Sequence, residues 1–346
     1  MRRRAPLVAL LLTTLLTACS DGAEEGGTVT LVTHDSFAVS KPVLRAFERE
    51  TGIHVKVLKS GDAGEVLNQV ILTKGAPLGD VVFGVDNTFL SRALAEQVFV
   101  PYRAKGLDRV PAALRLDPRH RATPIDWGDV CVNYDVAWYS ERGLEPPTNL
   151  VDLLDPRYRG QLVVENPATS SPGLAFFLAT IASEGSDGWE SYWSRLRAND
   201  VLVVDGWEQA YNTEFSASAG DGPRPLVVSY ATSPAAEVMF AEPPVDVAPT
   251  GNVEATCFRQ VEHAGILADA KHPVEARRFL DFLLSERFQA DVPASMFVYP
   301  AREGTPLPEE FVRYAAPPTT SLTLPPTAIA AKRDEWIERW TELTLR

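Results

Sequence analysis

The runs TVTLVT (28–33), IHVKVL (53–58) and DVVFGV (80–85) decide the fold of this chain. Each run is short and rich in Val, Ile, Leu and Thr, which is typical of a β-strand. A stretch with helical spacing of its apolar residues follows each run. The predicted helices begin at Pro42, cover residues 68–74 and cover residues 88–96. Three βα units in succession predict a doubly wound α/β lobe.

A second series of strands follows a loop rich in Pro and Arg at residues 101–124. The expected strands cover residues 130–133, 161–165, 201–204 and 226–230. Pro172 suits the first turn of a helix over residues 174–182, and amphipathic helices are predicted from Pro273 and over residues 328–345. Because domains have about 150 residues, the length of 346 residues predicts two domains.

The charge of the chain limits its partners. With 33 Lys and Arg against 46 Asp and Glu, the net charge is −13. Nucleic acid binding draws on clustered basic residues, so a polyanionic partner is not expected. A cationic or neutral ligand is easier to accommodate.

The N-terminus indicates export. Arg2, Arg3 and Arg4 precede an apolar stretch at residues 5–18 that is too short to span a bilayer, which is typical of a signal peptide. The stretch ends in Leu-Thr-Ala, and together with Cys19 this end resembles the bacterial lipobox. We therefore predict a signal peptide over residues 1–18, a lipid on Cys19 and an acidic tether over residues 19–27. The alternative is an ordinary secretory signal that contains a Cys.

The predicted mature chain carries two further cysteines, Cys131 and Cys257. An exported protein can hold disulfides, so the two can pair. Two buried free thiols are the other interpretation, because the sequence gives no distance between them. Removing residues 1–18 takes away three Arg and no acid, so the mature charge is 30 − 46 = −16.

Motifs for catalysis or metal binding are absent from the sequence. The five His show no paired metal spacing, and there is no nucleophile elbow or phosphate loop. Ferric-ion carriers of similar architecture use neighbouring Tyr ligands, and the sequence has no Tyr-Tyr pair. We expect no enzyme activity, no metal and no cofactor.

Acidic and aromatic residues instead gather near the predicted strand ends, where open α/β sheets bind ligands. Aromatic faces beside carboxylates suit a cation held by π contact. For any one residue the ordinary alternative is a helix cap or a core aromatic. The candidate ligand-binding residues at these positions are His34, Asp35, Asp62, Asp86, Trp127, Ser170, Trp207, Tyr211 and Tyr230.

Several segments together resemble one family. They are THDSF (33–37), DVVFGVDN (80–87), NPATSSPGL (166–174), GWEQAY (206–211), SYATSP (229–234) and VYP (298–300). In this order they are similar to the thiamine-binding subfamily of ABC-transporter solute-binding proteins. The resemblance implies a two-lobed type II periplasmic-binding-protein fold with its ligand cleft between the lobes.

The resemblance also implies roles. The protein would bind thiamine or its phosphates outside the cytoplasmic membrane, act as a monomer and deliver its ligand to a membrane permease. Asp62 would lie near the aminopyrimidine, Trp207 and Tyr230 would be the aromatic contacts, and Ser170 would donate a hydroxyl. The helix after residue 170 would offer backbone N–H groups to a phosphate.

We expect lobe 1 to comprise residues 28–124 and lobe 2 residues 125–257. Residues 258–346 would return to lobe 1 and end in helices that pack across both lobes. The sequence departs from the family pattern at His34 and Ala236, where Tyr is frequent, and at Phe297, where Trp is frequent. The resemblance thereby makes Phe297 a further candidate ligand-binding residue.

The sequence is also compatible with two other functions. A carrier for a polyamine or another organic cation would use the same acids and aromatics. An exported enzyme that processes thiamine belongs to a different class and predicts turnover of the ligand.

Overall fold

The computed structural model describes residues 27–217 and 220–346. The predicted signal peptide, the lipid on Cys19 and nearly all of the tether lie outside these residues. Among the described residues, no helix combines the length and apolar character needed to cross a bilayer.

The first half of the molecule is built from the three predicted βα units. Most Val and Leu side chains of the strands are buried, whereas Pro42 lies in the first turn of its helix and Gly52 ends it in the left-handed conformation with φ 70°. The elements are β1 (Thr28–Thr33), α1 (Lys41–Thr51), β2 (His54–Lys59), α2 (Ala63–Leu72), β3 (Val81–Asp86) and α3 (Leu90–Ala95). The strands β2, β1 and β3 lie parallel in that order.

The second half contains another parallel group, in which β5 lies between β6 and β7. Its helix α5 is capped by Ser170 and is buried along most of its length. The elements are α4 (Val136–Arg142), β5 (Leu162–Glu165), α5 (Ser171–Glu184), α6 (Trp189–Ala198), β6 (Leu202–Val204), α7 (Trp207–Gln209), β7 (Leu226–Tyr230) and α8 (Ser233–Phe240).

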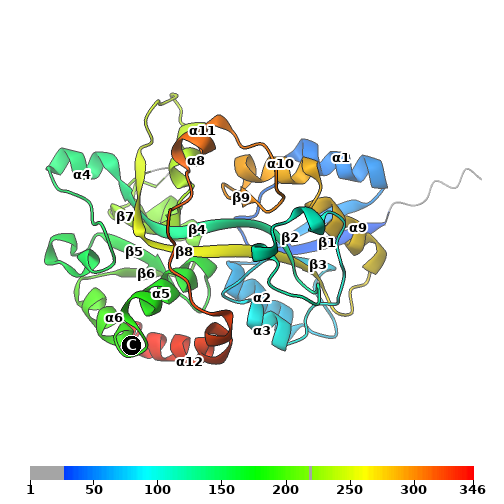
Figure 1. Ribbon diagram of the computed structural model, residues 1–346, viewed down its shortest axis with the longest axis horizontal. Coiled ribbons are helices and arrows are strands. Elements are labelled where there is room, and N and C mark those ends of the chain that lie inside the picture. Colours follow the sequence, from blue (N-terminus) through cyan, green and yellow to red (C-terminus); the bar gives the residue numbers. More distant parts are fainter. Residues whose placement is uncertain (1–26, 218–219) are drawn as a thin grey trace, which may run out of the picture.

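Two long antiparallel strands join the halves. The strands are β4 (Thr123–Asp135) and β8 (Thr250–Ile266), and β8 pairs with β3 of the first half while β4 pairs with β7 of the second. The sheet order is therefore β2-β1-β3-β8-β4-β7-β5-β6. Figure 1 shows β4 and β8 side by side across the middle of the molecule, with α1 and α9 at one end and α4 and α6 at the other.

The remaining chain returns to the first half and then spans the molecule. The elements are α9 (Pro273–Leu283), α10 (Glu286–Ser295), β9 (Tyr299–Pro300), α11 (Glu309–Tyr314) and α12 (Pro326–Thr344). Helix α12 packs against α6 in one half and α3 in the other. Its Trp340 is fully buried and meets Trp193 of α6 edge-on at 5.2 Å between ring centroids.

The two crossing strands are longer than the sequence pattern predicts. A strand over residues 130–133 is correct but incomplete, because β4 begins within the predicted loop and includes Pro124, Asp126 and Gly128. These residues are usually found in loops, and here they are buried in the middle of the sheet. The sequence pattern therefore does not reveal the first part of β4, whose Asp126 and Asp129 are buried.

A disulfide ties the crossing strands together. Cys131 of β4 and Cys257 of β8 are bonded, with Cα atoms 4.1 Å apart and a sequence separation of 126. Both residues are fully buried, and the only other member of their small cluster is Ala231. The bond therefore links the two connections through which the halves are joined.

Replacing both cysteines, as Cys131→Ala with Cys257→Ala, is expected to lower the free energy of unfolding by about 2–5 kcal/mol, because the long closed loop no longer restricts the unfolded chain. Urea unfolding of both proteins measures the difference. The single variant Cys131→Ala serves as a control that removes the bond and leaves Cys257 as a thiol. An unchanged unfolding midpoint in both variants would contradict this expectation.

Candidate functional site

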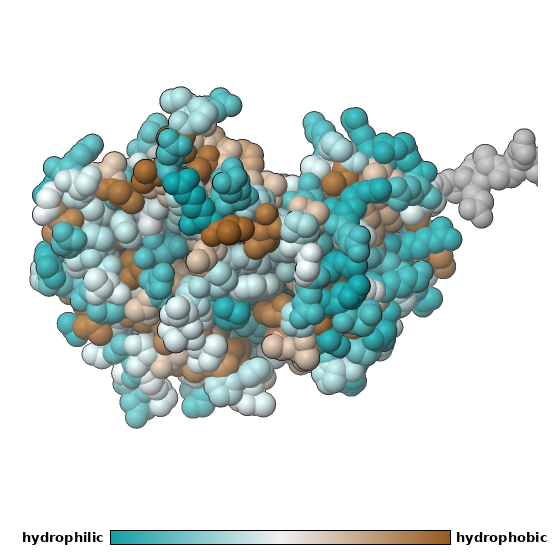
Figure 2. Space-filling view, turned by 45° about the horizontal axis from the view of Figure 1, so that its top comes forward, coloured by the Kyte–Doolittle hydropathy of each residue, from teal (hydrophilic) through white to brown (hydrophobic). Residues whose placement is uncertain are grey.

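A cavity of about 1000 Å³ lies between the two halves. Loops that follow β1 and β2 form one wall, whereas α7, β7 and α8 form the other. The end of α10 and the residues after it close one side. Figure 2 shows the surface hollowed between the two halves.

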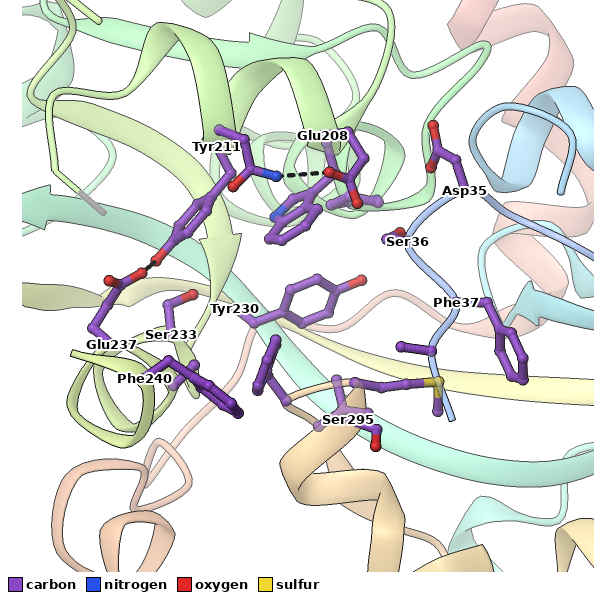
Figure 3. A pocket seen from close by; sticks show the side chains of 18 of the residues that line it. Asp35, Ser36, Phe37, Glu208, Tyr211, Tyr230, Ser233, Glu237, Phe240 and Ser295 are labelled. Carbon is purple, nitrogen blue, oxygen red and sulfur yellow. Dashed lines mark hydrogen bonds between the residues drawn. The ribbon is translucent and has the colours of Figure 1, made fainter. Parts of the chain in front are cut away.

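Most of the predicted binding residues line this cavity. They are His34, Asp35, Asp62, Trp207, Tyr211, Tyr230 and Phe297. The topology brings them together because the carboxyl ends of the parallel strands of both halves face the same space. In Figure 3, Tyr230 extends from β7 toward the loop that carries Asp35 and Ser36.

The aromatic wall belongs to the second half. The indole of Trp207 stacks on Tyr211, with ring centroids 5.0 Å apart and planes 14° from parallel. Trp207 Nε1 donates to Ser229 Oγ at 2.9 Å, and the Tyr211 hydroxyl donates to Glu237 Oε1 at 2.6 Å. These bonds hold the rings in place, so a flat ligand meets a rigid aromatic surface.

Phe297 follows the end of α10 on the cavity lining and meets Phe240 of α8, with ring centroids 5.4 Å apart. Phe297 has a positive φ of 57°, and its carbonyl oxygen accepts from the Thr232 hydroxyl. Such a φ is costly for a bulky residue and is held here by its surroundings. The smaller Ala236 also lines the cavity, where it leaves space beside the aromatic residues.

The charge of the cavity is mainly negative. Among the described residues that line it, Lys59 is the single lysine, and no arginine is among them. The acidic side chains on the lining are Asp35, Asp62, Glu208, Glu237, Glu242 and Glu262. A cationic ligand therefore gains electrostatic stabilisation that an anion would not.

Asp62 joins the two halves directly. Its Oδ1 accepts from the Ala63 N–H at 2.6 Å in α2 and from the Ser171 N–H at 3.4 Å in α5, while Oδ2 accepts from the Trp207 N–H at 3.1 Å. Burial raises the pKa of Asp62 to about 6, against the lowering effect of the hydrogen bonds from Ala63, Trp207 and Ser170. The carboxyl thus occupies the N-terminus of α5, the place where we expected donors for a phosphate.

Backbone contacts accompany this link. The Gly64 N–H of α2 donates to the Thr169 carbonyl oxygen of the second half at 2.8 Å. A Cβ at Gly64 would lie only 2.6 Å from that oxygen, so glycine is needed for the close approach. The halves therefore meet in a closed arrangement around the cavity.

Three predicted residues do not line the cavity, and each has a structural reason. Asp86 Oδ1 accepts from the hydroxyl and N–H of Thr88, so it caps its own turn. Trp127 stacks on Tyr299 at 4.4 Å, and the Arg259 guanidinium lies 4.5 Å from its ring centroid. Ser170 is fully buried and accepts from the Gly173 N–H as the N-cap of α5.

Other lining residues were not predicted. Glu262 is on β8 within a strand, so no strand-end signal marks it. Glu237 and Phe240 are on α8, where their spacing in the sequence would have allowed them to be assigned to one helix face. Met296 follows the end of α10. Among the described residues, no group of three or more His, Cys, Asp or Glu is arranged to hold a metal ion.

Comparison with known proteins identifies a matching family model and similar proteins. The family model described as bacterial extracellular solute-binding protein matches residues 76–322. The thiamine-binding periplasmic protein of Salmonella typhimurium is 30% identical over 337 residues, which are 96% of this chain and 98% of that protein. The protein of the same name from Brucella suis is also 30% identical, over 94% of both chains.

A solved structure named periplasmic thiamin binding protein has a TM-score of 0.82 with this chain. It is 28% identical and covers 94% of this chain and 98% of its own. The likeness confirms the predicted two-lobed α/β fold.

The buried acids predict a pH dependence of stability. Burial raises the pKa of Asp62 to about 6 and those of Asp86 and Asp126 to about 7, so in this range the folded protein binds protons that the unfolded chain does not. Lowering the pH from about 8 to about 6.5 is therefore expected to raise the free energy of unfolding by about 1 kcal/mol. Urea unfolding at the two pH values measures this difference.

Histidines act in the opposite direction. Burial lowers the pKa of His34 and of His263 to about 4, so the unfolded chain takes up protons at these residues as the pH falls toward about 6.5, which offsets part of the gain from the acids. Their stabilising effect continues to be lost as the pH falls further, toward about 4. The variant Asp86→Asn is a matched control and should show a smaller rise between pH 8 and 6.5. A fall in stability over this window in the unaltered protein would contradict the assignment of buried neutral acids.

Proposed function

This chain belongs to the bacterial extracellular solute-binding proteins, and from that premise we propose that its solute is thiamine, which it delivers to the permease of an ABC importer. The names of its relatives support thiamine as the ligand. Their likeness over nearly the whole chain supports the same task for this protein.

The combination of an aromatic wall and an acidic cavity is the observation that carries the proposal. The thiazolium of thiamine is a quaternary cation, so it cannot lose its charge by giving up a proton. Stacking over the Trp207 indole offers a π face, worth up to about 2 kcal/mol in a desolvated site. Carboxylates such as Glu208 and Glu237 add a negative field around it.

Free thiamine fits the closed arrangement better than its phosphates. The Ser171 N–H at the start of α5 already donates to Asp62, and Lys59 is the one lysine on the described lining. A phosphate at the α5 N-terminus would have to displace the Asp62 carboxyl. We therefore propose thiamine as the preferred ligand and its phosphates as weaker ones.

The family indicates a place outside the cytoplasm. We further propose that the protein is anchored there through a lipid on Cys19, acts as a monomer and does not catalyse a reaction. The predicted division into lobes, with lobe 2 over residues 125–257, is part of this proposal and is supported by the crossing of the chain on β4 and β8. Chromatography of thiamine after incubation with the protein tests the absence of catalysis, and a new product would refute it.

Isothermal titration with thiamine and with spermidine tests the ligand. The acidic lining also suits a polyamine, which makes spermidine the stringent competitor. Thiamine is expected to bind with a Kd of about 1 μM or below. Binding of spermidine without binding of thiamine would replace the proposal by a polyamine carrier.

Replacing the main aromatic face, as Trp207→Ala, is expected to weaken thiamine binding by about 1–2 kcal/mol, because a desolvated π face is lost. Titration calorimetry of the variant measures the change. Trp138→Ala is the matched control, since Trp138 lies on α4 away from the cavity and stacks under Arg142. Equal affinities of Trp207→Ala and the unaltered protein would remove Trp207 from the site.

A further inference from the structure

We propose that Glu262 and His34 form a polar subsite that takes the amidine edge of the ligand's aminopyrimidine, with Glu262 acting as a neutral carboxylic acid. This inference rests on the proposed function, because it assigns the subsite to one part of thiamine. It also gives a role to Glu262, which no signal in the sequence marks.

Three carboxyl groups lie in one row across the sheet. Glu262 of β8 is paired in register with Asp86 of β3 on one side and with Asp126 of β4 on the other. Residues paired in this way project from the same face of a sheet. Asp86 and Asp126 are fully buried, whereas Glu262 is 7% exposed and lines the cavity. Glu262 is thus the member of the row that a ligand can reach.

Asp126 has no ordinary hydrogen-bond donor. Both of its carboxyl oxygens are buried without a hydrogen-bond partner among the described residues. Oδ2 of Asp86 likewise has no partner among them. Two facing buried carboxylates repel each other strongly unless at least one of them is protonated. The row therefore favours the acid form of Glu262, whose O–H is then free to turn toward the cavity.

The charged and titratable groups around Glu262 support this state. They are Asp126, Asp86, Asp62, Tyr230 and His34, with Lys59 acting on His34 from further away. Burial, followed by the negative charge of Asp126, raises the pKa of Glu262 well above its ordinary value. Burial likewise lowers the pKa of His34 to about 4, so its imidazole is neutral and supplies no charge that would ionise Glu262.

His34 completes the subsite. Its Nε2 is 3.6 Å from Glu262 Oε1 and has no hydrogen-bond partner among the described residues, although it is buried. Its Nδ1 is 3.0 Å from Ser36 Oγ, which fixes the ring. An unsatisfied imidazole nitrogen therefore lies beside the Glu262 carboxyl on the cavity lining. A buried polar group without a partner is costly until a ligand satisfies it.

An aminopyrimidine matches this pair. Its amidine edge presents a ring nitrogen that accepts and an amino group that donates. A carboxylic acid can donate its O–H to the ring nitrogen and accept from the amino group through its carbonyl oxygen. A carboxylate can only accept, so it cannot satisfy both positions. The neutral subsite thus binds the pyrimidine edge, while the aromatic wall, Glu208 and Glu237 lie around the thiazolium.

Isosteric substitution at Glu262 tests the inference by titration with thiamine at pH 7. In Glu262→Gln the amide keeps one donor and one acceptor, so the affinity should stay within about threefold of the unaltered protein. In Glu262→Leu both are lost and the affinity should fall by at least about tenfold. If Gln weakens binding as much as Leu, Glu262 acts as an anion and the inference is overturned, and an unchanged affinity in Leu overturns it too.

The pH dependence is a second readout that does not need a disruptive variant. The affinity of the unaltered protein should fall as the pH rises and Glu262 loses its proton, whereas that of Glu262→Gln should show no such fall. Asp126→Asn removes the like charge beside Glu262, so the fall should move to lower pH. Parallel profiles in the unaltered protein and Glu262→Gln would overturn the inference.

Matched controls separate this inference from the proposed function. Glu254→Gln changes an exposed carboxylate of the same strand that does not line the cavity, and its pH profile should follow that of the unaltered protein. Thermal unfolding of each variant verifies that it is folded. If the unaltered protein does not bind thiamine at any pH, the proposed function fails; if it binds and the Glu262 variants behave alike, this inference alone fails.

Discussion

The antiparallel pairing of β4 with β8 is the constraint on which the rest of the structure depends. These strands carry the chain from one half of the molecule to the other and back, and the bond between Cys131 and Cys257 ties them together. Because each strand also belongs to the sheet of one half, the loops at the strand ends are placed around a common cavity. Asp126 and Glu262 face each other within this same pair, so the connection between the halves is also part of the site.

Burial of acids without basic partners distinguishes the site. Desolvation alone favours the neutral form of a carboxyl, and neighbouring negative charge adds to the effect. Asp62 differs from the row around Glu262, because backbone N–H groups from both halves stabilise its charge. The cavity thus combines acids that are held neutral with half-buried acids such as Glu208, and each kind suits a different part of a cationic heterocycle.

The fold was largely predictable, and the reason is local. Runs such as 28–33 and 80–85 carry the strand pattern by themselves, and the helices between them show their apolar spacing. The crossing strands were not predictable in full, because Pro124 and Asp126 interrupt the pattern and their pairing with β8 is decided by tertiary structure. Predicted site residues at strand ends, such as Trp207 and Tyr230, line the cavity. An acid that follows a strand can instead cap its own turn, as Asp86 does, and Glu262 was not predicted because it lies inside a strand.

The central claim is that the cavity binds thiamine as its solute. Purified protein incubated with an equimolar mixture of thiamine, thiamine monophosphate and spermidine, then washed and denatured, can be analysed by mass spectrometry for the molecules that it releases. The account predicts thiamine as the main released compound, in an amount close to that of the protein. Release of spermidine in place of thiamine, or of no compound from the mixture, would contradict it.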